Sequence, residues 1–141
     1  MGKRELRQNA IRALVRRYPI HTQQEIADHL KKQGFECTQA TVSRDIIELG
    51  LVKNMNKCYS APEDLRLQRL LADMVVSVRK AMNIVVIHTM DGAAAGVAGA
   101  LDKASVAEVL GTVAGDDTIF VVCQDETSAE RLVRSLGVLR R

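Results

Sequence analysis

The sequence predicts a mixed α/β (α+β) chain of two domains: an N-terminal winged helix-turn-helix and a C-terminal ββαββα domain. Two observations predict this. The hydrophobic period is helical through residue 49 and becomes that of strands after residue 74. Charge changes as well, because residues 1–70 carry 13 basic and 8 acidic side chains, whereas residues 71–141 carry 7 and 9. A basic half beside an acidic half indicates two modules, of which the first suits nucleic acid.

Three helices account for the first 50 residues. The first runs over residues 3–18 and ends before Pro19, because the residue before a proline avoids the helical conformation. Thr22 opens the second helix through a T-x-x-E capping box, and Gly34 ends it. The third helix covers residues 39–49. It lies between a capping threonine and a glycine.

The third helix has one apolar and one polar face. At about 100° per residue, Val42, Ile46 and Leu49 share one stripe, which predicts that they face the core. Arg44 lies at about 200° from Val42, on the opposite side of the helix. Small and hydroxyl-bearing side chains surround it, so this face allows close approach to another surface.

A basic hairpin follows the third helix. Residues 51–53 and 57–59 are predicted strands around the turn Asn54-Met55-Asn56. Three helices and a basic hairpin predict a winged helix-turn-helix, which places a helix in the major groove of DNA. We expect this domain to span residues 1–61 and a linker to span residues 62–73.

The second domain, residues 74–141, is predicted to form a four-stranded sheet with both helices on one face. We expect two strands around a turn near residues 80–83, followed by a small-residue helix over 92–101. Two further strands are expected over 108–114 and 118–123. A last helix, capped by Thr127 or Ser128, is expected to end at Leu136. A core this small is marginal alone, so the run VVIHT and the small-residue helix are candidates for subunit contacts. The alternative is a self-sufficient small domain.

Several classes of protein are excluded or disfavoured. No apolar run reaches the roughly 18 residues of a membrane helix, and no secretory signal opens the chain. Cys37, Cys58 and Cys123 fit neither a disulfide framework nor a zinc site, so we expect free thiols, no metal and a cytoplasmic location. No nucleophile paired with a base and no phosphate loop is visible, which predicts a protein that is not an enzyme and has no cofactor.

Two motifs resemble those of the bacterial arginine repressors. They are TQATVSRD, from Thr38, and GT-x-AGDDT, from Gly111, and the resemblance covers nearly the whole chain. It implies a DNA-binding transcriptional regulator of arginine metabolism genes, with L-arginine as corepressor. It also implies a C-terminal domain that forms trimers and pairs them into a hexamer on operator DNA.

The resemblance implies a set of DNA-binding residues. They are Gln23, Gln39, Thr41, Ser43, Arg44, Lys53 and Lys57. The fork of Arg44 can address guanine O6 and N7 together, and helix N-termini suit phosphate. Alternatively, Arg44 pairs with Glu48 one turn later, and the two lysines are solvated surface residues.

The resemblance also implies an arginine site. Its residues are Asp102, Thr112, Ala114, Asp116 and Asp117. Adjacent carboxylates repel unless a cation lies between them, and a planar guanidinium matches carboxylates in a bidentate way. Gly-Asp-Asp is also ordinary turn chemistry, so a plain hairpin turn and a Mg²⁺ site are the alternatives.

Three positions depart from the family pattern. Ala95 stands where relatives commonly carry a polar ligand contact, Asp91 replaces a proline, and Ile47 stands where a lysine is frequent. The first two motivate an alternative: a divergent paralogue that binds operator DNA and senses another ligand or none. A third hypothesis is a regulatory domain or enzyme fragment for which DNA binding is incidental.

Overall fold

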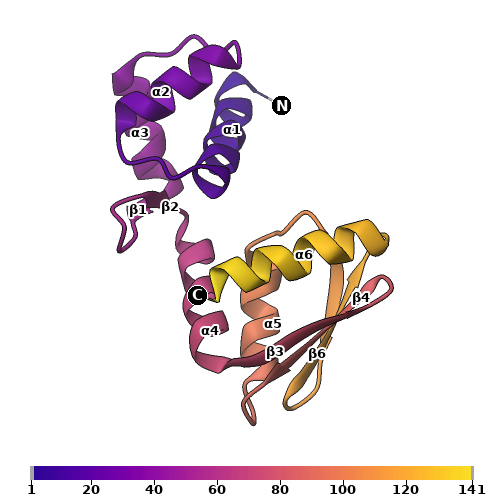
Figure 1. Ribbon diagram of the computed structural model, residues 1–141. Helices are drawn as coiled ribbons and strands as arrows, with labels where there is room; N and C mark the ends of the chain where they lie inside the picture. Colours follow the sequence, from indigo (N-terminus) through magenta and orange to yellow (C-terminus); the bar gives the residue numbers. More distant parts are fainter. Residues whose placement is uncertain (1, 141) are drawn as a thin grey trace. The chain divides into compact units, whose positions relative to one another are not determined.

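The computed structural model describes residues 2–140, which form two compact units that divide between Leu65 and Arg66. The first unit contains three helices and a hairpin, and the second a four-stranded sheet with helices (Figure 1). This confirms the mixed α/β fold class. Residues 1 and 141, at the outer ends of the two expected domains, lie outside the described range.

The first unit is a three-helix bundle closed by a hairpin. Helix α1 spans Lys3–Arg17, α2 spans Gln23–Lys32 and α3 spans Gln39–Leu49. The threonine half of the capping box forms as expected, since Thr22 Oγ1 accepts a hydrogen bond from the backbone N–H of Glu25, while the Glu25 carboxylate accepts from the N–H of His21 instead of that of Thr22. Gly50 ends α3 at a φ of 67°, a conformation that glycine adopts without strain.

The hairpin has a longer turn than the sequence indicates. Strand β1 covers Val52–Lys53 and β2 covers Tyr59–Ser60, in antiparallel pairing. The Asn54 side chain accepts hydrogen bonds from the backbone N–H groups of Asn56 and Cys58, so the turn runs through Cys58. The second strand therefore begins at Tyr59 and not at the expected residue 57. An Asx-type turn of this kind depends on one side chain, which strand periodicity does not reveal.

Helix α4, Pro62–Met74, occupies the segment expected to be a linker. Pro62 takes the first helical position, where its missing N–H costs nothing. Leu67 and Leu71, one turn apart, are buried in the core of the second unit. The charged residues around them obscured this i, i+4 pair in the sequence. The segment 62–73 is therefore a packed helix.

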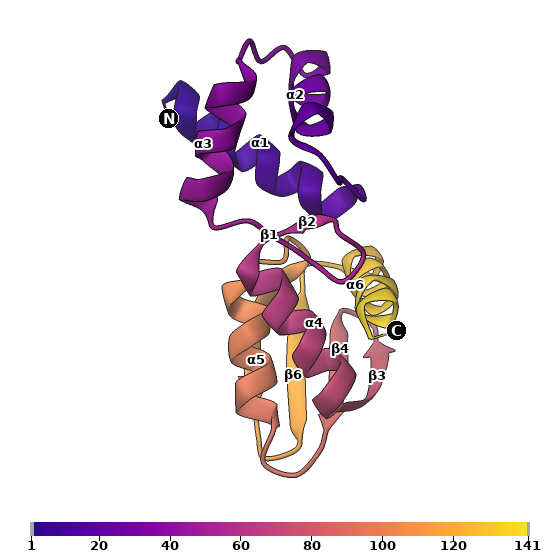
Figure 2. The same cartoon turned by 90° about the vertical axis from the view of Figure 1, so that its left-hand side faces the viewer.

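The second unit has a sheet in the strand order β3-β4-β6-β5, with every neighbouring pair antiparallel. Its strands are β3 (Val75–Ala81), β4 (Ile84–Thr89), β5 (Val109–Ala114) and β6 (Thr118–Cys123), and its helices besides α4 are α5 (Ala94–Lys103) and α6 (Glu126–Leu139). Helices α4, α5 and α6 pack against one face of the sheet (Figure 2). This matches the expected ββαββα order, with α4 added.

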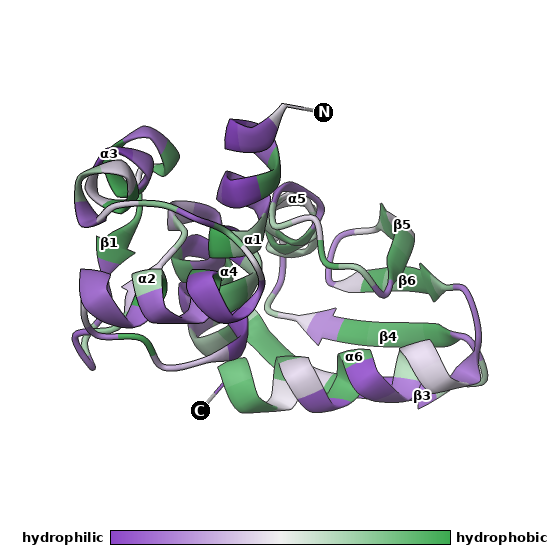
Figure 3. Cartoon of the chain, turned by 90° about the horizontal axis from the view of Figure 1, so that it is seen from above, coloured by the Kyte–Doolittle hydropathy of each residue, from purple (hydrophilic) through white to green (hydrophobic). Residues whose placement is uncertain are grey.

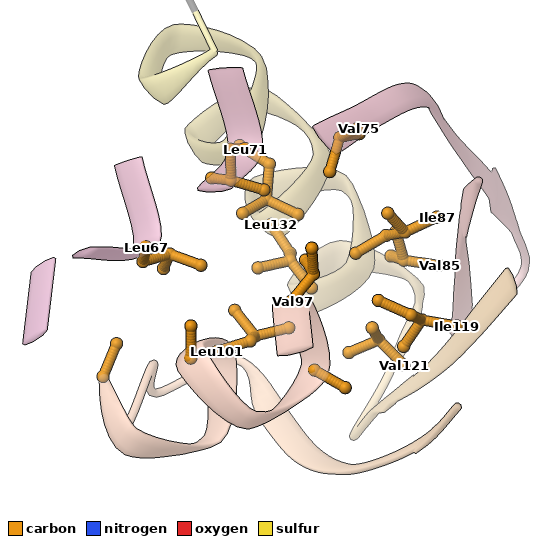
Figure 4. Close-up of a cluster of buried hydrophobic side chains, with 14 of the residues drawn as sticks. Leu67, Leu71, Val75, Val85, Ile87, Val97, Leu101, Ile119, Val121 and Leu132 are labelled. Atoms are coloured by element: carbon orange, nitrogen blue, oxygen red, sulfur yellow. The ribbon is translucent and has the colours of Figure 1, made fainter. Parts of the chain in front are cut away.

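The core of this unit lies between the sheet and the three helices. Leu71, Val97 and Leu132, from α4, α5 and α6, point toward the sheet residues Ile87 and Ile119 (Figure 4). All five are at most 1% exposed. The packing holds α5 against the sheet.

The opposite face of the sheet is also apolar but uncovered. Phe120 is 52% exposed and pairs across the sheet with Val86 and with Val113, which is 71% exposed. Strands β4 and β6 are hydrophobic along most of their length in Figure 3. Strands with two apolar faces are typical of sheets covered on both sides.

Among the helices within residues 2–140, none has the length and apolar character needed to span a membrane.

Candidate nucleic-acid interface and effector site

The outward face of α3 presents Arg44 to solvent. Arg44 is exposed, and residues 2–140 record no hydrogen bond or ion pair to its guanidinium. Ala40, one turn earlier, is exposed, and Ile47 is 77% exposed. Val42 and Ile46 face the core, as the helical projection predicts. The guanidinium of Arg44 is thus free to bind an acceptor outside the chain.

Glu48 does not pair with Arg44. Its carboxylate accepts a hydrogen bond of 2.7 Å from Gln8 Nε2 and forms an ion pair with Arg4, both of which lie on α1. The structure therefore differs from the alternative in which Arg44 is held by Glu48. The two helices contact one another through these polar groups at the end of α3.

Asp45 fixes α3 to α1. It is only 2% exposed, and its carboxylate accepts hydrogen bonds from Arg7 Nε, Arg7 Nη2 at 3.0 Å and Gln8 Nε2 at 3.1 Å. Bidentate arginine–carboxylate pairs are directional, so this contact sets the rotation of α3 about its axis. That rotation determines where Arg44 points.

The pKa of Asp45 lies below its ordinary value. Burial alone raises the pKa of a carboxyl, but the hydrogen bonds from Arg7 and Gln8 and the positive charge of Arg7 outweigh it. The same contact raises the pKa of Arg7, chiefly through its hydrogen bond to Asp45. The pair is therefore fully ionised at neutral pH.

The remaining polar candidates lie at helix starts. Gln23 is the first residue of α2, and Gln39 is the exposed first residue of α3. Thr41 is half-buried, with its hydroxyl 3.0 Å from that of the capping Thr38. Ser43 is half-buried on the flank of Arg44. These positions place donors at helix N-termini, where backbone N–H groups favour phosphate oxygens.

The hairpin carries two basic residues that differ in their surroundings. The ammonium of Lys53 lies 5.1 Å from the centre of the Tyr59 ring, a cation–π contact that holds it along the hairpin. Lys57 is exposed and has a φ of 61°. The backbone N–H of Tyr59 donates to the carbonyl of Ile20, which anchors the hairpin to the loop between α1 and α2.

Asp116 and Asp117 lie in the exposed turn between β5 and β6. Asp116 Oδ2 accepts a hydrogen bond of 3.3 Å from the backbone N–H of Gly92, and its carbonyl accepts from Ala94 at the start of α5. The Thr118 hydroxyl donates to Asp117 Oδ1 at 3.0 Å. The turn and the start of α5 are thus tied together, with both carboxylates open to solvent.

Asp102 and Thr112 form a second group at the other end of α5. The Thr112 hydroxyl donates to both carboxylate oxygens of Asp102, at 3.0 and 3.1 Å. A shallow cavity of about 150 Å³, lined by Asp102, Ser105 and Leu110 among others, lies beside them. Ala114 is exposed at the end of β5. No hydrogen bond or ion pair recorded within residues 2–140 joins this pair to Asp116 and Asp117.

The acids of this region share one property. Asp91, Asp102, Asp116 and Asp117 form no ion pair among residues 2–140. Ala95, in the first turn of α5, is exposed but brings no polar group. Asp116 and Asp117, adjacent in one turn, are the two uncompensated acids between which a cation would bind favourably. Within the described residues, no group of three or more His, Cys, Asp or Glu side chains is arranged to hold a metal ion.

His88 has an ordinary polar contact across the sheet. It is exposed on β4, with Nδ1 3.3 Å from the Thr118 hydroxyl on the neighbouring strand.

The sequence does not predict the contacts of Arg4, Arg7 and Gln8 with α3. One signal was present: Asp45 lies about 60° from Val42 on the helix, on the core side, and a buried acid needs a partner.

Comparisons with known proteins match both units. Residues 2–66 match the family model "Arginine repressor, DNA binding domain", and residues 71–137 match "Arginine repressor, C-terminal domain". An arginine repressor of Carboxydothermus hydrogenoformans is 46% identical over 138 residues, covering 90% of this chain and 92% of that protein. One from Acetivibrio thermocellus is 39% identical, covering 96% and 95%. The chain belongs to the arginine repressor family.

Proposed function

We propose that this chain is a DNA-binding transcriptional regulator of arginine metabolism genes, with L-arginine as corepressor. The observation that carries the proposal is the free guanidinium of Arg44 on the outward face of α3, in a domain that matches an arginine repressor DNA-binding domain. Such a regulator acts in the cytoplasm and needs no catalytic step or resident cofactor.

In this proposal α3 enters the major groove of operator DNA. Arg44 donates two hydrogen bonds to guanine O6 and N7, the commonest specific base contact of arginine, and Ser43 lies beside it. The phosphate contacts are assigned to the helix starts and the hairpin: Gln23, Gln39, Thr41, Lys53 and Lys57. Contacts to phosphate position the domain, whereas Arg44 supplies sequence specificity.

L-arginine binds the acids around α5. Its guanidinium lies against Asp116 and Asp117, which have no cation of their own within residues 2–140. Asp102, Thr112 and Ala114 complete the site from further along α5 and β5. No hydrogen bond or ion pair within residues 2–140 joins the two acidic groups, so we assign the full site to residues of neighbouring subunits.

The exposed apolar face of the sheet supports a proposal for the oligomer. We propose a hexamer of two trimers, in which the apolar outer face of the sheet, including Val113 and Phe120, is covered by other copies of the chain. Arginine bound between subunits favours the assembled state over free subunits. That difference in affinity is what a corepressor requires.

The proposed DNA binding by α3 is tested with the variant Arg44→Ala. The probe is a duplex that the wild-type chain selects from a random-sequence library, and its affinity is measured by fluorescence anisotropy. Loss of a bidentate base contact is expected to cost about 1–3 kcal/mol and to reduce discrimination against unrelated DNA. Equal affinity and discrimination in wild type and variant would rule out the assigned reading face.

The proposed binding of L-arginine is tested by isothermal titration of L-arginine into the wild type and the variant Asp117→Asn. The proposal predicts binding by the wild type and at least tenfold weaker binding by the variant. A wild-type chain that binds no arginine would instead support a divergent regulator. Ala95 and Asp91 are the positions to examine in that case.

A further inference from the structure

The acidic residues of α3 contact α1, whereas its one basic residue does not. Helix α3 carries one basic residue, Arg44, and two acidic residues, Asp45 and Glu48. Both acids bind side chains of α1, whereas Arg44 binds none within residues 2–140. Glu48 lies four residues after Arg44, the spacing at which side chains on one helix meet.

We propose that α1 keeps the DNA-reading arginine available: Arg4, with Gln8, occupies the Glu48 carboxylate that would otherwise pair with Arg44. The inference rests on the proposed function, because it assigns Arg44 to DNA. Arg4 and Gln8 are then positioning residues that act through Glu48 and Arg44.

The geometry supports this role in two ways. Gln8 Nε2 lies 2.7 Å from Glu48 and 3.1 Å from Asp45, so one amide links both acids to α1. The buried contact between Asp45 and Arg7 holds the two helices in register, which keeps Arg4 within reach of Glu48. The carboxylate of Glu48 is thereby neutralised where an unpaired negative charge would also repel DNA phosphate.

The Arg4–Glu48 pair is suited to this task and little suited to stabilising the fold. The side chain of Arg4 is 66% exposed and that of Glu48 is 40% exposed. Exposed ion pairs contribute little to folding, so Arg4 can be replaced without unfolding the domain. A change in DNA affinity on replacing Arg4 therefore reports on its effect at the DNA-binding face.

The test measures the affinity of the full chain for the selected duplex, with the urea midpoint recorded for each variant. Arg4→Met is expected to weaken binding by about two- to fivefold per DNA-binding unit, because Glu48 is then free to compete for Arg44. Glu48→Gln in the same chain is expected to restore wild-type affinity. Arg12→Met is the matched control, an exposed α1 arginine with no ion pair recorded within residues 2–140, and it should leave affinity close to wild type.

A second arm uses Arg44→Ala as background. If Arg4 acts through Arg44, adding Arg4→Met to Arg44→Ala causes no further loss of affinity. Loss that persists in that background, or that Glu48→Gln fails to restore, shows instead that Arg4 contacts DNA itself and overturns the inference. Unchanged affinity in Arg4→Met while Arg44→Ala weakens binding also overturns it, and leaves the proposed function intact. If Arg44→Ala itself has no effect, the proposed function fails.

Discussion

Two neighbouring residues of α3, Arg44 and Asp45, have opposite surroundings. Arg44 is exposed without a partner within residues 2–140, while Asp45 is buried and accepts three hydrogen bonds from α1. One residue of separation turns the side chain by about 100°, enough to move it from solvent to the interface between helices. A single helical turn thus holds both the group proposed to read DNA and the group that orients it.

Replacing Asp45 should destabilise the first unit and change its response to acid. Asp45→Asn keeps the shape but leaves the Arg7 guanidinium without its carboxylate, at an expected cost of about 2–4 kcal/mol. The folded-state pKa of Asp45 lies below the unfolded value, so its stabilisation is complete above the unfolded pKa. That stabilisation is lost as the pH falls toward the folded pKa.

Urea unfolding at a series of acidic pH values measures this effect. The free energy of unfolding of the wild type should fall more steeply below about pH 4 than that of Asp45→Asn, because only the wild type must protonate this carboxyl. Parallel curves for the two proteins, or equal stability at neutral pH, would contradict the assigned role of Asp45.

At the scale of elements, the sequence predicts most boundaries and misses those set by single contacts. Helix α3 and strand β6 fall where periodicity, caps and glycines indicate. The sequence predicts a linker over 62–73 because the charges there mask the Leu67–Leu71 pair, which is buried in helix α4. The exposure of Arg44, opposite the buried Val42, could be predicted because it follows from helical rotation alone. The contacts from α1 could not, since they join residues about 40 positions apart.

The N-cap residue of helix α6 differs from the one that the sequence suggests. The sequence suggests Thr127 or Ser128 as the cap, but the structure uses Asp125, whose carboxylate accepts a 2.7 Å hydrogen bond from the Ser128 N–H. This bond also lowers the pKa of Asp125. Several capping residue types lie close together here, and only the backbone conformation decides among them.

Substitution at both positions tests this assignment of the α6 cap. Asp125→Ala should destabilise the chain by about 1 kcal/mol, because it removes the acceptor for an otherwise unpaired N–H at the helix start. Thr127→Ala, two residues further on, should change the free energy of unfolding by less than about 0.5 kcal/mol. The assignment is wrong if chemical denaturation shows the larger loss for Thr127→Ala.

At the scale of the whole molecule, one face of the sheet is covered by helices and the other is exposed. One face carries the core shared with α4, α5 and α6, while the other presents Val113 and Phe120 to solvent beside the half-buried Val86. Exposed apolar rows of this kind mark interaction surfaces. The proposed oligomer places other copies of the chain on this face.

Phe120→Asp should therefore reduce the size of the assembly. A charge in the middle of an apolar interface is costly to bury, whereas the same residue on a free surface is tolerated. Sedimentation velocity should show smaller species for this variant than for the wild type. Val138→Asp, at an exposed apolar position of α6, is the control and should sediment as the wild type does. A Phe120→Asp protein with wild-type sedimentation would place the subunit contacts elsewhere.

The central claim is that arginine binding in one unit controls DNA binding by the other. The affinity of the full chain for its selected duplex, measured with and without saturating L-arginine, tests it most directly. DNA binding is expected to be tighter with L-arginine, and arginine affinity is expected to rise by the same factor when DNA is bound, because coupling between two ligands is reciprocal. The same DNA affinity in the presence and absence of L-arginine would contradict it.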